Sequence, residues 1–103
     1  MTVLGLGHKY LLQQFESKLD SQELQFIHKE PENPGSIELK TVCDGTTNEE
    51  VLAVLINRMY FLQSKFPCRE NAIVITKLEE SLMWLNKRTA DRIMRGVAGK
   101  QIK

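Results

Sequence analysis

The stretch FPCRENAIVITKLEESLMWLNKRTADRIMR, residues 66–95, decides the fold. A helix that begins near Pro67 carries apolar residues at i, i+3, i+7 and i+10, which is the spacing of one buried seam. These residues are Ile75, Leu78, Leu82 and Leu85. Three guanidinium groups follow on one face near the C-terminal end of the helix, those of Arg88, Arg92 and Arg95. The first pattern predicts a packing partner, and the second predicts a solvated helix end or an anion site.

The predicted packing partner of this helix is the segment that precedes it in the chain. Thr47 and Glu50 have the spacing of a capping box, which predicts a helix start. Apolar residues then recur at a/d spacing at Leu52, Leu55, Met59, Leu62 and Phe66. Pro67 ends this helix and can begin the next. Because the connection is so short, the two helices are expected to form an antiparallel helical hairpin over about residues 47–95.

The N-terminal part predicts a small sheet over about residues 8–43. Residues 37–42 alternate in polarity, and residues 31–35 are dense in turn formers, so a hairpin with residues 23–29 is expected. Residues 8–20 stay open between two structures: Leu11, Phe15 and Leu19 suit a helix, whereas Tyr10 and Leu12 alternate as strands do. The expected fold class is α+β: a small antiparallel β-sheet, a helical hairpin and a tail over 96–103, in a single domain of 103 residues.

Composition restricts the partners. A net charge of +1 does not favour binding to DNA, because proteins that bind nucleic acid through bulk charge carry a clear basic excess. The apolar stretches are too short to span a membrane, and the N-terminus lacks the pattern of a signal peptide. A cytoplasmic location is therefore expected, with Cys43 and Cys68 as small semi-buried reduced thiols.

Motifs for catalysis are missing from the sequence. His8 and His28 show no metal-ligand spacing with each other or with a cysteine. The segment Gly5-Leu6-Gly7 lacks the third glycine and the preceding strand of a dinucleotide fingerprint. Glu79 and Glu80 are adjacent, so they point about 100° apart on a helix and are expected to be solvated carboxylates. No catalytic residue, metal or cofactor is predicted.

Anion binding has more support. Residues 87–103 hold six basic residues and one acidic residue, Asp91, within a chain of net charge +1. Two interpretations stay open: basic residues that suit the helix macrodipole, with Asp91 paired to Arg95, or a phosphate site. Arg69 and Asn71 lie in the first turn of the second helix, a second place that favours anions. Asn71 and Arg88 are expected to lie some 30 Å apart in one chain. A site that uses both therefore requires an oligomer.

The sequence DGTTNEEVLAVLINRM, followed by KFPCRENAIVITKLEESLMWLNKRTADR, resembles the helical-hairpin family of bacteriophage anti-defence proteins. That family includes Thoeris anti-defence sponges and anti-CBASS sponges. The resemblance covers about residues 44–95 and rests on the pieces PCREN, KLEE, WLN and RTADR in this order. The N-terminal pieces HKY and QFIHKEP are similar to the longer, sheet-bearing Thoeris type.

The resemblance implies a protein that performs no reaction. Such proteins sequester cyclic nucleotide immune signals in the host cytoplasm: cyclic ADP-ribose isomers such as glycocyclic ADP-ribose, or cyclic di- and trinucleotides at separate sites of a hexamer. By motif position it implies Phe61 as a base-stacking ring, Asn71 as a polar reader and Arg88 as a phosphate or ribose ligand, with Arg69 and Arg92 as further ligands. Residues 96–100 depart from the GVEGT-like pattern expected there.

The expected partners are a cyclic nucleotide and further copies of the chain, in a homo-oligomer between dimer and hexamer, with neither DNA nor a membrane. Two other functions remain as alternatives. One is a phosphodiesterase-like enzyme that degrades the signal. The other is a structural phage protein that binds no nucleotide.

Overall fold

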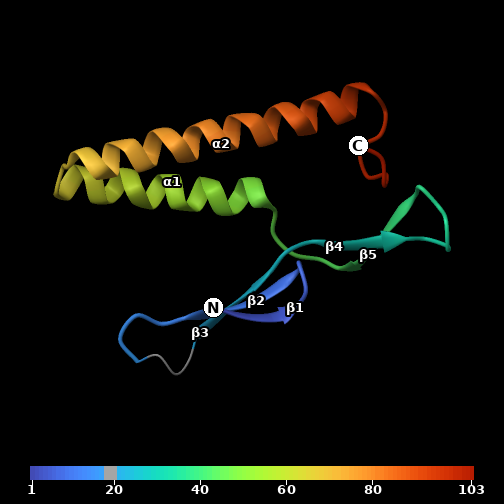
Figure 1. The fold of residues 1–103 in the computed structure, drawn as a ribbon, viewed down its shortest axis with the longest axis horizontal. Helices are drawn as coiled ribbons and strands as arrows, with labels where there is room; N and C mark the ends of the chain where they lie inside the picture. Colours follow the sequence, from blue (N-terminus) through green and yellow to red (C-terminus); the bar gives the residue numbers. More distant parts are fainter. Residues whose placement is uncertain (18–20) are drawn as a thin grey trace. The chain divides into compact units, whose positions relative to one another are not determined.

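The computed structural model describes residues 1–17 and 21–103. Its elements are β1 (Thr2–Gly5), β2 (Lys9–Gln13), β3 (Ser21–Gln25), β4 (His28–Pro31), β5 (Leu39–Cys43), α1 (Asn48–Lys65) and α2 (Arg69–Met94) (Figure 1). They form two compact units, Met1–Thr47 and Asn48–Lys103. The first unit holds every described strand and the second holds both helices, which confirms the predicted α+β class.

The three-stranded sheet has the order β1-β2-β3, with both pairings antiparallel. Residues 9–13 are thus a strand, which decides between the two structures left open for this segment. Leu19, part of the helical alternative, lies outside the described residues. The statement that no strand precedes Gly5-Leu6-Gly7 was wrong, because β1 ends at Gly5. Gly7 has a φ of 78°, the left-handed region in which glycine alone is unstrained, and so turns β1 into β2.

The hairpin predicted across residues 31–35 is present, but its first strand is shorter than expected. β4 pairs antiparallel with β5, whereas β3 ends at Gln25 and pairs with β2. The chain changes partners in between: the N–H of Phe26 donates to the carbonyl of His8 at 2.7 Å, and that of Ile27 to the carbonyl of Thr46 at 2.9 Å. The structure therefore has two separate sheets where the sequence predicted one. Ile37, expected on a buried face, is exposed and lies outside β5.

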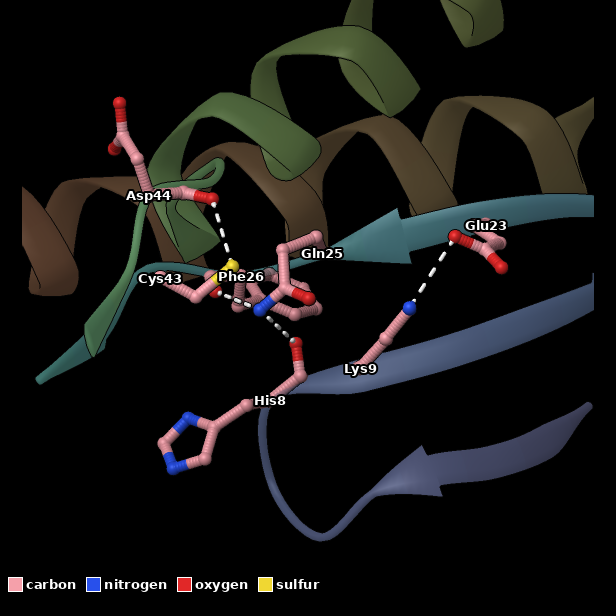
Figure 2. A network of polar contacts seen from close by, with 7 residues as sticks. All are labelled: His8, Lys9, Glu23, Gln25, Phe26, Cys43 and Asp44. Atoms are coloured by element: carbon pink, nitrogen blue, oxygen red, sulfur yellow. Dashed lines mark hydrogen bonds and ion pairs between the residues drawn. The ribbon is translucent and has the colours of Figure 1, made fainter.

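The side chain of Gln25 stabilises the segment in which the chain changes from one strand partner to another (Figure 2). Its side-chain amide donates to the carbonyl of Phe26 at 2.7 Å and to that of His8 at 3.4 Å. In the same view, Lys9 of β2 forms a 3.4 Å ion pair with Glu23 of β3. Exposed ion pairs stabilise little, so the amide contacts to backbone carbonyls are the more important restraint.

Gly45 is packed against the same segment, and replacing it by alanine is expected to destabilise the first unit. An added Cβ would lie 2.4 Å from the carbonyl oxygen of Gln25 and 2.7 Å from the carbonyl carbon of Phe26. Since these are backbone atoms, the chain itself must shift. The expected loss in the free energy of unfolding is about 1–3 kcal/mol, measured by denaturant titration.

Gly5→Ala is the matched control for that substitution. Gly5 also lacks a positive φ, and its added Cβ would meet the Cβ of Lys9 at 3.3 Å, a contact that a small adjustment relieves. If Gly45→Ala cost no more than Gly5→Ala, the close backbone approach would not be what Gly45 is needed for.

The helical hairpin is antiparallel, as predicted. Thr89 of α2 donates to Glu49 at the start of α1 at 3.4 Å, and Tyr60 near the end of α1 donates to Glu79 at 2.8 Å. The predicted seam of α2 is confirmed: Ile75 is buried, and Leu78, Leu82 and Leu85 are half-buried.

Two members of the predicted α1 seam were wrong. Leu55 is exposed and Ile56 is half-buried in its place, because the 3.6-residue turn brings i+4 from Leu52 onto the inner face. Phe66 lies beyond the end of α1 and is exposed. α1 begins at Asn48, directly after Thr47, while the capping box itself stays a prediction.

The turn between the helices is closed by one side chain. The Gln63 amide donates to the carbonyl of Cys68 and accepts from the N–H of Cys68, both at 3.1 Å. α2 begins at Arg69, after Pro67, and Cys68 caps it by accepting from the N–H of Asn71 on its sulfur at 3.4 Å. Cys43 and Cys68 are free thiols as predicted, but both are exposed where semi-buried positions were expected.

α2 ends in a glycine cap. Gly96 has a φ of 70°, its N–H donates to Ile93, and the N–H of Val97 donates to Arg92. This is a Schellman motif, in which glycine permits the left-handed residue. The chain leaves the helix here, as predicted. With 26 residues against 18, α2 extends past the start of α1 (Figure 1).

Very little of the chain is shielded from water. Within the described ranges, Ile75 at 6% exposure is the one buried residue. Large apolar side chains stay exposed on both helices: Val54, Leu55, Tyr60, Phe61, Ile73, Val74, Met83, Trp84, Ile93 and Met94. Neither helix is long and apolar enough to cross a membrane. The second unit therefore has a large apolar surface that its own helices leave uncovered.

Candidate functional site

Three of the predicted ligand residues lie at the closed end of the hairpin. Phe61 stands one turn before the end of α1, and Arg69 and Asn71 stand in the first turn of α2. Phe61 is 57% exposed, and the ammonium group of Lys65 lies 5.6 Å from the centroid of its ring. Asn71 is half-buried and Arg69 exposed. This closed-end cluster combines a flat ring with polar groups at a helix N-terminus, which suits a base beside an anion.

Arg88 lies in a second cluster, near the open end. Trp84, Lys87, Arg88 and Asp91 line a surface hollow of about 290 Å³. Trp84 is 58% exposed, and the ammonium group of Lys87 lies 5.9 Å from the centroid of its ring. Asp91 forms the predicted ion pair with Arg95 at 3.4 Å. In the part of the chain that the structure describes, no hydrogen bond or ion pair engages the guanidinium of Arg88.

The open-end cluster of Trp84, Lys87, Arg88 and Asp91 contains groups that can bind an anion. A guanidinium fork binds phosphate oxygens through two parallel hydrogen bonds, and an exposed indole offers a stacking face. The Asp91–Arg95 pair supports the macrodipole interpretation for Arg95 alone. Arg88 is outside that pair, so a ligand that binds Arg88 would break no hydrogen bond or ion pair of its guanidinium to residues 1–17 or 21–103.

Arg92 has a different environment. Its guanidinium donates to the carbonyls of Val97 at 3.0 Å, Lys100 at 2.7 Å and Ile102. These bonds hold the tail against α2 in the structure. Arg92 is therefore occupied, in contrast to Arg88 one turn before it.

A further hollow of about 430 Å³ lies between the helices, lined by Ile56, Glu79, Leu82, Met83 and Asn86. At Glu79 the expectation of a solvated carboxylate was incomplete, because Glu79 accepts a 2.8 Å hydrogen bond from the hydroxyl of Tyr60. That hydrogen bond, together with desolvation and the charge of Glu79, raises the pKa of Tyr60 above its ordinary 10.0.

Glu79→Gln is expected to bring the pKa of Tyr60 back toward its ordinary value. The raised pKa means that folding favours the neutral hydroxyl, so the stabilisation is present below about pH 10 and lost as the pH rises through the folded-state pKa. Ultraviolet titration of tyrosinate in a Tyr10→Phe background, which leaves Tyr60 as the one tyrosine, measures this. Glu80→Gln is the control, and an equal lowering there would contradict the Tyr60–Glu79 assignment.

The structure does not bring the two clusters together within one chain. Asn71 and Arg88 are 17 positions apart on α2, about 26 Å along the axis of a continuous helix. Phe61, Arg69 and Asn71 thus share the closed end, while Arg88 and Arg92 share the open end. A compact ligand that contacts both clusters requires two chains.

Sequence reasoning missed two side chains that shape these ends. Gln63 carries no motif, and its role depends on meeting Cys68 across the turn. Cysteine is outside the usual N-cap residues, although Pro67 before it and Glu70 after it indicated a helix start.

His8 and His28 stack with ring centroids 3.8 Å apart. Residues 1–17 and 21–103 contain no group of three or more potential ligands for a metal.

Comparison with known proteins gives two findings. The model of the Acb2/Tad1 hairpin domain matches residues 22–90. A Bacillus phage SBSphiJ7 protein named Thoeris anti-defense 1 is 60% identical over 58 residues, which are 55% of this chain and 41% of that protein. The chain thus aligns with less than half of this relative's length. Residues 22–90, which the family model matches, include Phe61, Arg69, Asn71 and Arg88.

Proposed function

We propose, since this chain belongs to the Acb2/Tad1 hairpin family, that it is a phage anti-defence protein that binds and sequesters a cyclic nucleotide immune signal without cleaving it. The ligand class is that of cyclic ADP-ribose isomers, glycocyclic ADP-ribose among them, with cyclic di- and trinucleotides as further members. The name of the phage relative supports the anti-defence role. The place of action is the cytoplasm of the host.

One observation carries the ligand class: the guanidinium of Arg88 lines a hollow beside Trp84 and Lys87, and among residues 1–17 and 21–103 it has no hydrogen-bonded or ion-paired partner. Two cations supply donors for a phosphate, and the exposed indole supplies a face for a base. Arginine side chains at helix ends usually either point into solvent or join ion pairs, as Arg95 does. Arg88 is also exposed, but among the described residues it joins no ion pair and lines a hollow with Trp84 and Lys87, which supports a role in binding a phosphorylated, aromatic ligand.

The proposed binding site is shared between copies of the chain. Phe61, Arg69 and Asn71 lie too far from Arg88 for one small ligand, and the helices expose apolar side chains that self-association would cover. In a symmetric oligomer, between dimer and hexamer, the closed end of one hairpin meets the open end of another. Oligomerisation is therefore part of the proposed site.

Sequestration demands affinity and no turnover. A sponge lowers the free concentration of a signal by mass action, so its dissociation constant must lie below the concentration at which the signal activates its effector. Nothing in the two clusters resembles a nucleophile with an activating base, which is what a degrading enzyme would use.

The test is calorimetry of the purified protein with a panel of cyclic ADP-ribose isomers and cyclic oligonucleotides, followed by heat denaturation and analysis of the released compound. Tight binding with intact ligand supports the proposal. A cleaved product would favour the phosphodiesterase-like alternative, and absence of retention across the panel would favour a structural protein.

Light scattering on the same samples gives the mass of the assembly. The expected mass lies between that of a dimer and that of a hexamer. The expected stoichiometry is at most one ligand for every two chains. A monomer that still binds the ligand tightly would contradict the shared site.

A further inference from the structure

The tail, residues 96–103, is bound by the two arginines at the end of α2. Arg92 donates to the carbonyls of Val97, Lys100 and Ile102, and Arg95 donates to that of Lys103. The Schellman motif at Gly96 turns the chain back so that these carbonyls face the helix end. The same motif ties Arg92 twice to Val97, through the backbone and through the side chain. The tail thus gives the guanidinium of Arg92 a set of oxygen acceptors.

These carbonyl oxygens take the donors that a phosphate would take. A guanidinium presents five N–H donors in one planar fork, and both carbonyls and phosphate oxygens bind along the directions of those N–H groups. Carbonyl dipoles that converge on Arg92 also turn their negative ends toward any incoming anion. An anion and the tail therefore compete for the same donors.

We propose that the tail is an internal competitor for the anion site at the open end: with the tail docked, Lys87 and Arg88 receive an anion without Arg92, and Arg92 joins only after the tail is released. This regulation rests on the proposed function. Arg88 and Arg92 stand one helical turn apart, about 5–6 Å between Cβ atoms, so an anion with two charged groups reaches both. Ligand binding is then expected to loosen the tail, whereas a lid would tighten on its ligand.

Gly99→Val tests the competition and leaves Arg92 in place. Gly99 has a φ of 76° with open space around it, so a β-branched residue strains the docked tail through its backbone alone. The probe is inorganic pyrophosphate, measured by calorimetry on the full chain. A gain in pyrophosphate affinity of about three- to tenfold is expected, with no gain when Arg92→Ala is added.

Gly35→Val is the matched control. Its φ of 81° and open surroundings equal those of Gly99, but it lies in the turn between β4 and β5 and is not part of the tail. Pyrophosphate affinity is expected to stay unchanged in this variant. An equal gain there, an unchanged or lower affinity in Gly99→Val, or no pyrophosphate binding by either chain would overturn the proposal.

Amide hydrogen exchange of residues 97–103 in the native chain is the second measurement. Pyrophosphate is expected to speed exchange at the N–H of Lys100, which donates to Val97 in the docked tail. Slower exchange would mean that the tail closes over the anion, which overturns competition. Because the probe is pyrophosphate, this result is independent of nucleotide binding, and failure of the proposed function shows separately in the nucleotide panel.

Discussion

Replacing Arg88 by alanine is expected to weaken binding of the cyclic nucleotide about tenfold to a hundredfold while leaving the thermal midpoint unchanged. A hydrogen bond to a charged group contributes about 1.5–3 kcal/mol, and 1.4 kcal/mol corresponds to a factor of ten. The stability is expected to persist because the Arg88 guanidinium has no hydrogen-bonded partner in the described part of the chain. Calorimetry and thermal denaturation on the same preparation measure both.

Arg58→Ala is the matched control for Arg88→Ala. Arg58 is an exposed arginine of α1 and does not line the hollow beside Trp84. The substitution removes the same charge from the second unit and is expected to leave affinity within about twofold, since one screened surface charge contributes little. Equal losses in both variants would show a general charge effect and would count against a ligand role for Arg88.

Replacing Ile75 by alanine is expected to lower the free energy of unfolding by about 2–4 kcal/mol. Ile75 is the most deeply buried described residue, at 6% exposure, and it anchors the seam along which α2 packs on α1. The loss combines the transfer of apolar groups with the cavity left behind. Denaturant titration followed by circular dichroism at fixed protein concentration measures it.

Ile73→Ala is the same substitution two residues earlier on the same helix. Ile73 is 45% exposed, so the transfer loss is expected to be smaller and no cavity is formed. Helix propensity changes equally in the two variants and cancels in the comparison. If Ile73→Ala cost as much as Ile75→Ala, the seam would not be what holds the hairpin, and the surface around Ile73 would be covered by another copy.

The hairpin was predictable because its signals are local. Pro67 interrupts two helical patterns, and the apolar spacing of Ile75, Leu78 and Leu82 follows from the geometry of one helix. The inner face of α1 was predicted less well, since Leu55 and Ile56 are both apolar and only packing decides which of them turns inward. The apolar periodicity predicts the inner face of a helix to within one residue. Contacts with the second helix decide which of two neighbouring apolar residues turns inward.

The sheets were predicted only in outline because their pairings are long-range. The turn formers at 31–35 mark the β4–β5 hairpin, but no local pattern tells that Phe26 bonds to His8 and Ile27 to Thr46. These two bonds interrupt the strand and separate β3 from β4. The missed strand β1 has the same cause, because its ladder with β2 is what makes residues 2–5 a strand.

The candidate site shows what the helical spacing of arginines can predict and what it cannot. Arg88 and Arg92 are equivalent by helical spacing, yet one faces a hollow and the other is bound by three carbonyls. The difference comes from the tail, whose course is set by the positive φ of Gly96. A repeated arginine pattern therefore predicts one common environment for its members, whereas the structure gives Arg88 and Arg92 different ones.

The unequal lengths of the two helices divide α2 into a part that packs on α1 and a tip that does not. The half that packs on α1 contains Ile75, and changes there reduce the stability of the whole hairpin. Beyond Thr89, α2 extends past the start of α1, so this tip can fray as a local opening that leaves the packed half intact. Under the proposed function, substitutions at this tip, where Arg92 and Arg95 lie, can change the binding of an anion without unfolding the packed part of the hairpin. The overhang is then the segment of α2 in which recognition can change at the smallest cost in stability.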